Sequence, residues 1–208
     1  MYSSNQQVVS FLFHWFEENV RDFPWRMSDD PYVILVAEFL LQKTPADRVK
    51  AIFNKLISKY PDITSLAKAD PSELSKEFAE LGLTKRFKWI VDSMNFILSK
   101  HNGKIPTDKK KLLELPGVGE YTASAFLSFG HNVDIEIVDA NVIRFYTRFF
   151  NIPKIEVNEL AREMVPKRNS KNFNFALLDF ASLVCKKKPV CSECGLSTNC
   201  SYFNSNLN

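Results

Sequence analysis

An all-α fold is predicted for this chain of 208 residues. Apolar residues recur at helical spacing in one segment after another, and no segment alternates at a period of two for long. Eighteen phenylalanines against six glycines favour helices packed by aromatic side chains over a turn-rich β architecture. Ile135–Val138 is the nearest approach to an extended stretch, and it has no predicted partner. We therefore expect helices and no sheet.

Proline, glycine and aspartate mark the ends of the helices in the first half of the chain. Pro31 stands at the first position of an apolar helix, where its missing N–H is not needed, and Pro61 ends another. The predicted helices are Val8–Asn19, Pro31 to about Leu41, Ala46–Lys59, one opened by Asp70–Glu73 and broken at Leu81–Leu83, and Arg86–Ser99, which His101–Gly103 terminates.

A glycine turn separates the next two predicted helices. The first is capped by Thr107 and runs to Leu115, and the second is Glu120–Phe129. Between them, Gly117 and Gly119 flank one apolar residue, so the backbone can turn sharply and approach another surface closely. The N–H groups that open the second helix suit a phosphate. A bare turn of this kind would be structural, but Leu-Pro-Gly-Val-Gly between two helices resembles the helix-hairpin-helix element, which binds a DNA backbone.

Asp139 precedes a predicted helix that reaches Phe149. Aspartate is a leading N-cap residue, and the amides of Asn141 or Val142 would satisfy its side chain. This structural role is compatible with a catalytic one, because the same hydrogen bonds and the helix dipole favour the charged carboxylate. A fixed anion beside a sugar suits a reaction with an oxocarbenium-like transition state.

Glu38 is the only charged residue in the apolar segment Tyr32–Leu41. A buried carboxylate is costly, so Glu38 is either a paired structural group or a site residue. Burial would raise its pKa and suit it to donate a proton or a hydrogen bond to a base.

Gln42 and Lys43 follow at the polar end of the same helix. They belong either to a solvated helix end or to a loop that wedges into a DNA duplex once a base has flipped out.

The charge balance excludes little. A formal net charge of +3 is compatible with nucleic-acid binding but does not predict it, because local patches matter more than the total. Met1–Val9 has no apolar core of a secretory signal. Tyr32–Leu41 is about half the ~20 residues that cross a bilayer. We therefore expect an intracellular protein, cytoplasmic and associated with the nucleoid, with no membrane partner.

Four cysteines lie close together near the end of the sequence, with the spacing C-x5-C-x2-C-x5-C. They are Cys185, Cys191, Cys194 and Cys200. In a reducing compartment such density indicates a metal site rather than disulfides. Zinc and an iron–sulfur cluster both accept four thiolates. Lys186–Lys188 would place cations near a phosphate with either metal.

Taken together, these segments resemble the iron–sulfur branch of the helix-hairpin-helix DNA glycosylases, which includes endonuclease III and MutY, and most of all the MIG thymine/uracil mismatch glycosylases. Nearly the whole chain takes part in this likeness. The matching segments are Arg21–Arg26, Asp30–Leu35, Leu115–Gly119 with Tyr121, Val138–Asn141, Phe173–Phe175, Leu178–Phe180 and Cys194–Ser197.

The resemblance implies two helical lobes with a DNA cleft between them. One is a six-helix barrel at 25–132 that contains the helix-hairpin-helix at 107–129. The other joins 1–24 to 133–208 and carries a [4Fe–4S] cluster loop at 185–200. The family usually has six residues between its first two cysteines, whereas Cys185 and Cys191 have five between them. A loop can absorb that difference, so the expected cofactor remains [4Fe–4S], in a form that could be labile.

Site roles follow from the same resemblance. Asp139 would stabilise the sugar cation or activate water, Tyr121 would shape the base pocket, and Glu38 would contact the flipped base. Members that also cut the strand carry lysine where this chain has Tyr121, and tyrosine cannot form the Schiff base, so a monofunctional enzyme is expected. The expected DNA-binding residues are Gln42, Lys43, Leu115, Gly117, Val118 and Gly119.

The expected reaction is removal of thymine or uracil mispaired with guanine. The alternative is removal of adenine opposite 8-oxoguanine, as in MutY. Ala140 stands where MutY-like sequences usually have glycine, and the sequence ends eight residues after Cys200, which leaves no room for the C-terminal domain of MutY. Both features favour the pyrimidine reaction.

A DNA-binding module without catalytic activity is a second alternative. The joint presence of Asp139, Tyr121 and Glu38 counts against it, because a scaffold would not need all three. The expected partner is double-stranded DNA with a mismatched or damaged base, and we expect a monomer.

Overall fold

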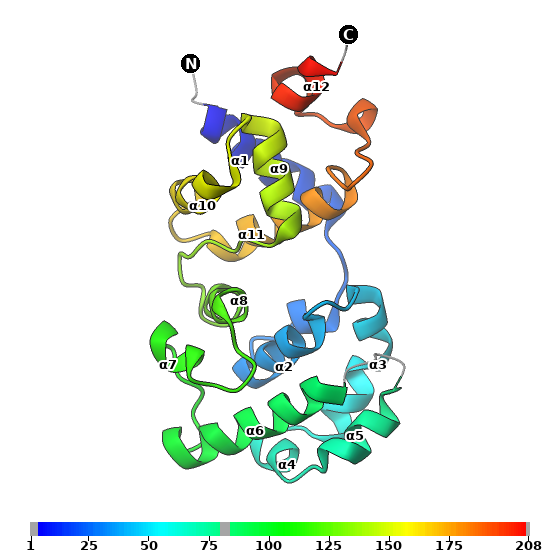
Figure 1. Ribbon diagram of the computed structural model, residues 1–208, viewed down its shortest axis with the longest axis vertical. Coiled ribbons are helices and arrows are strands. Elements are labelled where there is room, and N and C mark those ends of the chain that lie inside the picture. Colours follow the sequence, from blue (N-terminus) through cyan, green and yellow to red (C-terminus); the bar gives the residue numbers. More distant parts are fainter. Residues whose placement is uncertain (1–3, 80–83, 207–208) are drawn as a thin grey trace. The chain divides into compact units, whose positions relative to one another are not determined.

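The computed structural model describes residues 4–79 and 84–206, and within those ranges the regular structure is helical (Figure 1). The predicted all-α class is confirmed, and Ile135–Val138 is irregular. The chain forms two compact units, residues 22–131 and residues 1–21 with 132–208. We call them the hairpin unit and the cluster-loop unit. No helix in the described ranges has the length and apolar character to cross a membrane.

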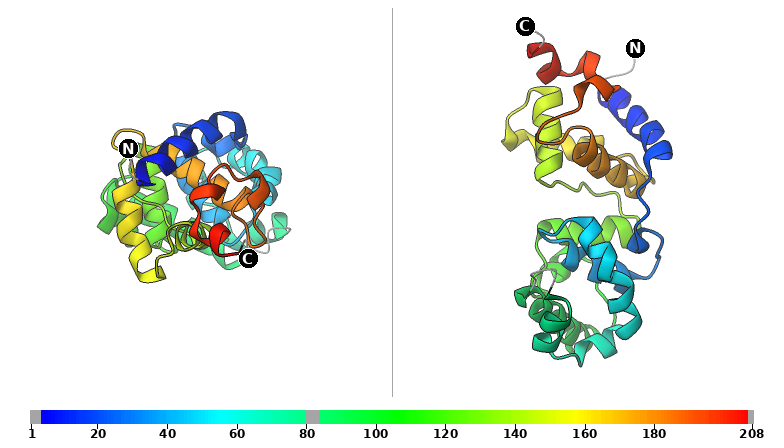
Figure 2. Two further views of the ribbon diagram at one scale, coloured as in Figure 1. Left: turned by 90° about the horizontal axis from the view of Figure 1, so that it is seen from above. Right: turned by 90° about the vertical axis from the view of Figure 1, so that its right-hand side faces the viewer.

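The hairpin unit is a bundle built around α2 and α8. Helix α2 packs against α3, α6 and α8, and α6 also covers α4 and α5. The right-hand view of Figure 2 shows this bundle from the side. The helices are α2 (Pro31–Leu41), α3 (Ala46–Lys59), α4 (Ile63–Ala67), α5 (Pro71–Glu77), α6 (Thr84–His101), α7 (Lys109–Leu113) and α8 (Glu120–His131).

Aspartate caps fix the starts of several of these helices. Helix α2 starts at Pro31, as predicted, and Asp30 directly before it caps the helix by accepting a hydrogen bond from Tyr32 N at 2.8 Å. Helix α4 was not predicted, although Asp62 and Ser65 form a reciprocal capping box. Asp108, rather than the predicted Thr107, caps α7 by accepting from Lys111 N at 3.0 Å. The predicted break at 81–83 lies outside the described residues.

The cluster-loop unit packs around one aromatic side chain. Its helices are α1 (Ser4–Asn19), α9 (Ala140–Phe150), α10 (Val157–Met164), α11 (Ser170–Leu183) and α12 (Ser201–Ser205). Helix α1 lies along α11, which also packs on α9 (Figure 2). Phe180 of α11 is fully buried and meets Phe11, Trp15 and Phe145 edge to face, with ring centroids 5.5, 5.3 and 5.5 Å away. Such aromatic pairs stabilise a core beyond the area that they bury.

Gly195 allows the cysteine loop to approach α1. A Cβ at this position would lie 2.5 Å from Cε2 of Phe11, a separation that real Cβ atoms do not tolerate. The loop that follows Cys194 therefore packs directly on the first helix of the same unit.

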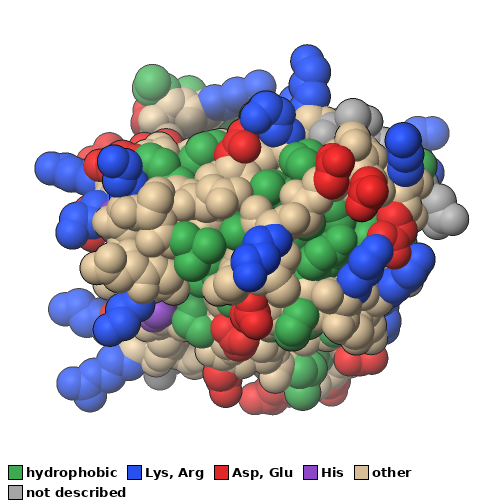
Figure 3. All heavy atoms as spheres, turned by 90° about the horizontal axis from the view of Figure 1, so that it is seen from below, with side chains coloured by type: hydrophobic (Ala, Val, Ile, Leu, Met, Phe, Trp, Pro, Cys, Tyr) green, Lys and Arg blue, Asp and Glu red, His purple; other side chains and the backbone are tan. Residues whose placement is uncertain are grey.

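Surface charge is distributed unevenly. The face drawn in Figure 3 carries many lysine and arginine side chains along its left edge and others along its upper and right edges, with acidic and hydrophobic side chains interspersed between them. The small net charge of +3 thus averages over local patches.

Candidate functional site

The hairpin at 115–119 presents backbone rather than side chains. Gly117 has a left-handed φ of +77°, and a Cβ there would lie 2.8 Å from Cβ of Trp89, so only glycine suits the position. The side chains of Leu115 and Val118 are buried in the hairpin unit. A Cβ at Gly119 would meet no atom within 4 Å. What this element can offer a phosphate is therefore the backbone at the start of α8, approached over Gly119.

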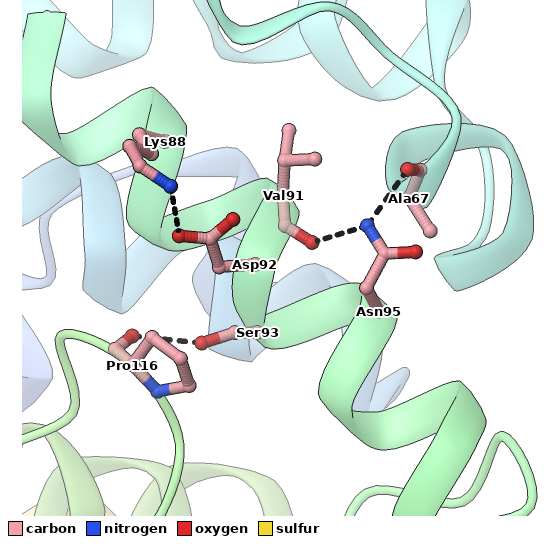
Figure 4. A network of polar contacts seen from close by, with 7 residues as sticks. All are labelled: Ala67, Lys88, Val91, Asp92, Ser93, Asn95 and Pro116. Carbon is pink, nitrogen blue, oxygen red and sulfur yellow. Dashed lines mark hydrogen bonds and ion pairs between the residues drawn. The ribbon is translucent and has the colours of Figure 1, made fainter.

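Two side chains hold the hairpin from the protein side. Ser93 of α6 donates from Oγ to the Pro116 carbonyl at 2.7 Å (Figure 4). Gln42, which directly follows α2, donates from Nε2 to the Gly117 carbonyl at 2.9 Å and to Thr122 Oγ1 at 3.2 Å. The sequence assigned Gln42 to DNA contact, and in the structure its amide contacts the hairpin. Lys43 beside it is exposed, with a left-handed φ of 55°.

Glu38 of α2 is a buried acid. Its side chain is only 4% exposed, and Oε2 has no hydrogen-bond partner among the described residues. Burial raises its pKa from the ordinary value of 4.5 to about 8, against a smaller opposing effect of Arg26. At neutral pH the group is mostly protonated, so it can donate a proton or a hydrogen bond.

Tyr121 is the second residue of α8 and is half-buried. Because α2 and α8 pack against each other, Glu38 and Tyr121 lie on two neighbouring helices of the hairpin unit. A phenol at this position supplies a hydroxyl and an aromatic face, and it has no amine with which to form an imine.

Asp139 of the cluster-loop unit is held as a hydrogen-bond acceptor on both oxygens. Oδ1 accepts from the backbone N–H groups of Asn141 at 2.8 Å and Val142 at 2.7 Å. Oδ2 accepts from Asn141 Nδ2 at 2.8 Å. The predicted N-cap is confirmed, with both candidate amides bound. Both oxygens of Asp139 therefore serve as acceptors, and three donors fix their position.

A chain of hydrogen bonds runs from Asp139 to the cysteine loop. Arg144 donates from Nη2 to Asn141 Oδ1 at 2.9 Å and to the Ala181 carbonyl at 2.8 Å. Its Nε donates to the Cys185 carbonyl at 2.8 Å. The orientation of the Asn141 amide, and through it the setting of Asp139, is thereby tied to the residue that opens the cysteine loop.

Arg148 binds the same loop one helical turn further along α9. Nη1 donates to the Lys186 carbonyl at 2.8 Å and to Cys185 Sγ at 3.7 Å, and the guanidinium lies 4.7 Å from the ring centre of Tyr202. Sequence reasoning missed both arginines. Their spacing of four residues, which places Arg144 and Arg148 on one face of the predicted helix, is the signal that could have found them.

The four cysteines line one cavity, together with aromatic and aliphatic side chains and Arg148, and none of them forms a disulfide. Burial raises the pKa of the Cys185 thiol. Burial, with the other three cysteines nearby, raises the pKa of Cys194 to about 11. Within the described residues, no three His, Cys, Asp or Glu side chains are grouped as ligands of a single metal ion. The thiol chemistry and the shared cavity fit a cluster bound by cysteine.

The predicted site residues thus fall into two groups. Glu38, Gln42, Lys43, Tyr121 and the hairpin belong to the hairpin unit, whereas Asp139 and the four cysteines belong to the cluster-loop unit.

Residues 36–167 match a protein family described as HhH-GPD superfamily base excision DNA repair protein. The chain is 36% identical over 204 residues to a thymine/uracil-DNA glycosylase of Methanothermobacter thermautotrophicus, an alignment that covers 94% of this chain and 92% of that protein. It is 32% identical over 194 residues to an adenine DNA glycosylase of Mycolicibacterium smegmatis, covering 89% of this chain and 66% of that protein. A solved structure of a thermostable thymine-DNA glycosylase superposes with a TM-score of 0.91 at 34% identity, covering 97% of both chains.

Proposed function

The chain belongs to the HhH-GPD superfamily of base excision DNA repair proteins and is a DNA glycosylase, and from that premise we propose that it removes thymine or uracil mispaired with guanine. The observation that carries the chemistry is the contrast between Glu38, buried with no partner for Oε2 among the described residues, and Asp139, which accepts three hydrogen bonds. The likeness to a thymine/uracil-DNA glycosylase at 36% identity supports the choice of base.

Glu38 acts on the leaving base. With a pKa of about 8, it holds a proton at neutral pH and can pass that proton, or a hydrogen bond, to the base as the glycosidic bond between C1′ and nitrogen breaks. The electron pair of that bond leaves with the base. A neutral base is a better leaving group than an anion, so this donation lowers the barrier.

Asp139 acts on the sugar. Bond cleavage leaves positive charge at C1′ and the ring oxygen, and a carboxylate fixed by three donors stabilises that charge without rearranging. A water oxygen then bonds to C1′ and its proton passes to the carboxylate of Asp139. The products are the free base and an abasic site.

Tyr121 makes the enzyme monofunctional in this proposal, because it offers no amine to attack C1′. Borohydride trapping during excision of uracil tests this directly. We expect no covalent adduct between protein and DNA and strand cleavage only after alkali. An adduct stable to denaturation would show that another residue supplies an amine.

Cys185, Cys191, Cys194 and Cys200 would hold a [4Fe–4S] cluster, supported by their shared cavity. Such a cluster would order the loop that carries Lys186–Lys188 and so place three cations for phosphate contact. Iron analysis of protein purified without oxygen is expected to give about four iron atoms per chain. One zinc per chain would contradict the cluster.

A single-turnover excision assay tests the substrate. Duplexes with G·T, G·U, adenine opposite 8-oxoguanine, and full pairing are incubated with excess protein, and alkali then reveals abasic sites. Release confined to G·T and G·U is expected. Release of adenine would favour the alternative that the likeness to an adenine DNA glycosylase supports, and release from the paired control would show that the mismatch is not required.

A further inference from the structure

The Gln42 amide nitrogen donates both of its hydrogens within the protein. One amide hydrogen goes to the Gly117 carbonyl at 2.9 Å and the other to Thr122 Oγ1 at 3.2 Å. A primary amide nitrogen has two hydrogens, so none remains for a base or a phosphate. Thr122 is itself buried, which places this contact inside the hairpin unit rather than on its surface.

The loop that carries Gln42 is itself fixed. Arg86 of α6 donates from Nη1 to the Leu40 carbonyl and to Thr44 Oγ1, both at 3.0 Å. The first of these bonds satisfies a carbonyl at the end of α2, and the second holds the residue two positions beyond Gln42. The Gln42 side chain therefore extends from an anchored backbone and reaches 75 residues along the sequence to the hairpin.

The hairpin needs such supports, because a backbone that binds phosphate must keep its N–H groups aligned. In its turn, Gly117 packs closely against the Trp89 side chain. The Pro116 carbonyl accepts a hydrogen bond from Ser93 (Figure 4). Gln42 is the support that comes from the helix of Glu38. It thus joins the element that would bind the DNA backbone to the element that would contact the base.

We propose that Gln42 is a positioning residue that fixes the hairpin in its DNA-binding shape, and that its neighbour Lys43 makes the duplex contact. Lys43 is the exposed neighbour, and its left-handed φ of 55° directs the chain differently from the helix that precedes it. The proposal rests on the proposed function, because it takes the hairpin as a DNA-binding element.

The two roles for Gln42 have different kinetic signatures. A hairpin support affects the binding of every duplex, paired or mismatched, and leaves the rate at saturating DNA nearly unchanged. A wedge acts after the base has flipped, so its loss lowers the excision rate at saturation and leaves the binding of fully paired DNA unchanged.

The test compares Gln42→Met with Asn95→Leu. Both changes remove a neutral amide of similar size without adding charge. Asn95 is the matched control, because its Nδ2 also donates twice in the hairpin unit, to Ala67 O and Val91 O at 3.0 Å each (Figure 4). Dissociation constants are measured for a paired and a G·U duplex, together with the single-turnover rate at saturating DNA.

We expect Gln42→Met to weaken the binding of both duplexes about five- to tenfold, the scale of one or two net hydrogen bonds. The single-turnover rate at saturating DNA should change less than about threefold. Asn95→Leu should change neither. A second variant, Ser93→Ala, removes the support at Pro116 from a fully buried side chain that cannot touch DNA. It should reproduce the same signature, and it keeps the proposal testable if Gln42→Met fails to fold.

Three results would overturn the proposal. The first is paired-duplex binding unchanged with a lower saturated rate, which is the behaviour of a wedge. The second is no change in either quantity. The third is an equal loss of binding in Asn95→Leu, which would mark a general effect on the fold. Excision by the unaltered protein is measured separately, so failure of the proposed function is distinguishable from failure of this inference.

Discussion

Glu38 of the hairpin unit and Asp139 of the cluster-loop unit are carboxyl groups held in contrasting surroundings. Glu38 lies in an apolar helix, 4% exposed, and Oε2 finds no hydrogen-bond partner in the described part of the chain. Asp139 stands at a helix start, where its two oxygens accept three hydrogen bonds.

This contrast places the same functional group in two different surroundings. Removal from water disfavours the anion at Glu38, whereas three donors fix the position of the Asp139 carboxyl group. Pairs of acids whose surroundings separate their charge states are how enzymes obtain a proton donor and an anion together near neutrality. Each residue therefore has the surroundings that its proposed role in glycosidic bond cleavage requires.

The largest expected effect is that of Asp139→Asn. The amide keeps the size of the side chain but removes the negative charge opposite the developing sugar cation, so single-turnover excision of uracil should fall on the order of a thousandfold. Binding of G·U duplex, measured by fluorescence anisotropy, should stay within about threefold.

Asp134→Asn is the matched control for that change. Asp134 is an exposed aspartate of the same unit that accepts from Arg168 N at 2.9 and 3.0 Å, and its loss should leave excision unchanged. If Asp139→Asn retains full activity, Asp139 is not the carboxylate that stabilises the sugar cation.

Glu38→Gln is expected to reduce excision about a hundredfold at pH 7, the usual scale for loss of a general acid. The unaltered enzyme should lose activity as pH rises through about 8, where Glu38 ionises, and the glutamine variant should lack that decline. A pH–rate profile at saturating DNA measures both, and an identical profile in the variant would remove Glu38 from the reaction.

The pH dependence of folding stability provides a second test of the ionisation of Glu38. The folded-state pKa of about 8 exceeds the ordinary 4.5, so the folded protein binds more protons than the unfolded one between these pH values. The contribution of Glu38 to folding stability is therefore fully present below about pH 4.5 and is lost as pH rises to about 8. Relative to the unaltered protein, Glu38→Gln should become more stable over that range, by a few kcal/mol at pH 8, as read from urea unfolding. If the difference in unfolding free energy between the two proteins became smaller as pH rises, the raised pKa of Glu38 would be contradicted.

Arg144→Met should have a smaller effect, about tenfold on excision. The variant keeps Asp139 and its two backbone donors but frees the Asn141 amide, and it removes the bonds to the Ala181 and Cys185 carbonyls. Loss of bound iron is expected to accompany the loss of activity. Arg162→Met is the control, since Arg162 pairs only with Glu136 on the surface at 3.3 Å among the interactions of the described residues. Equal effects of the two variants would show that the chain from Asp139 to the cysteine loop carries nothing specific.

The smallest expected effects are changes in folding stability caused by one glycine substitution in each unit. Gly195→Ala would place a Cβ 2.5 Å from Phe11 and should destabilise the cluster-loop unit by about 1–3 kcal/mol. Gly130→Ala in α8 meets only ordinary contacts of 3.6–3.7 Å and should stabilise the hairpin unit by up to about 1 kcal/mol through helix propensity. Thermal unfolding followed by circular dichroism distinguishes them, and a stabilising Gly195→Ala would show that the loop can move away from α1.

Local signals predicted the parts of this protein that depend on neighbours in sequence. The helix start at Pro31 and the Asp139 cap were predicted because such signals act within two or three residues. The same reasoning failed at Thr107, where Asp108 is an equally good cap one residue away and takes the role. It also missed α4, whose five residues are too few for a hydrophobic period to be seen.

The sequence by itself determined the helical class, the glycine hairpin, the acid in the apolar helix and the four-cysteine spacing, because each depends on residues that are close together in the sequence. Only the tertiary structure decided which donors those groups meet. The Gln42 amide donates to the hairpin, and Arg144 joins the Asp139 cap to the cysteine loop. Within the part of the chain that the structure describes, Oε2 of Glu38 has no partner. Such contacts join residues tens of positions apart, and their geometry arises only when helices pack, so no local pattern contains them.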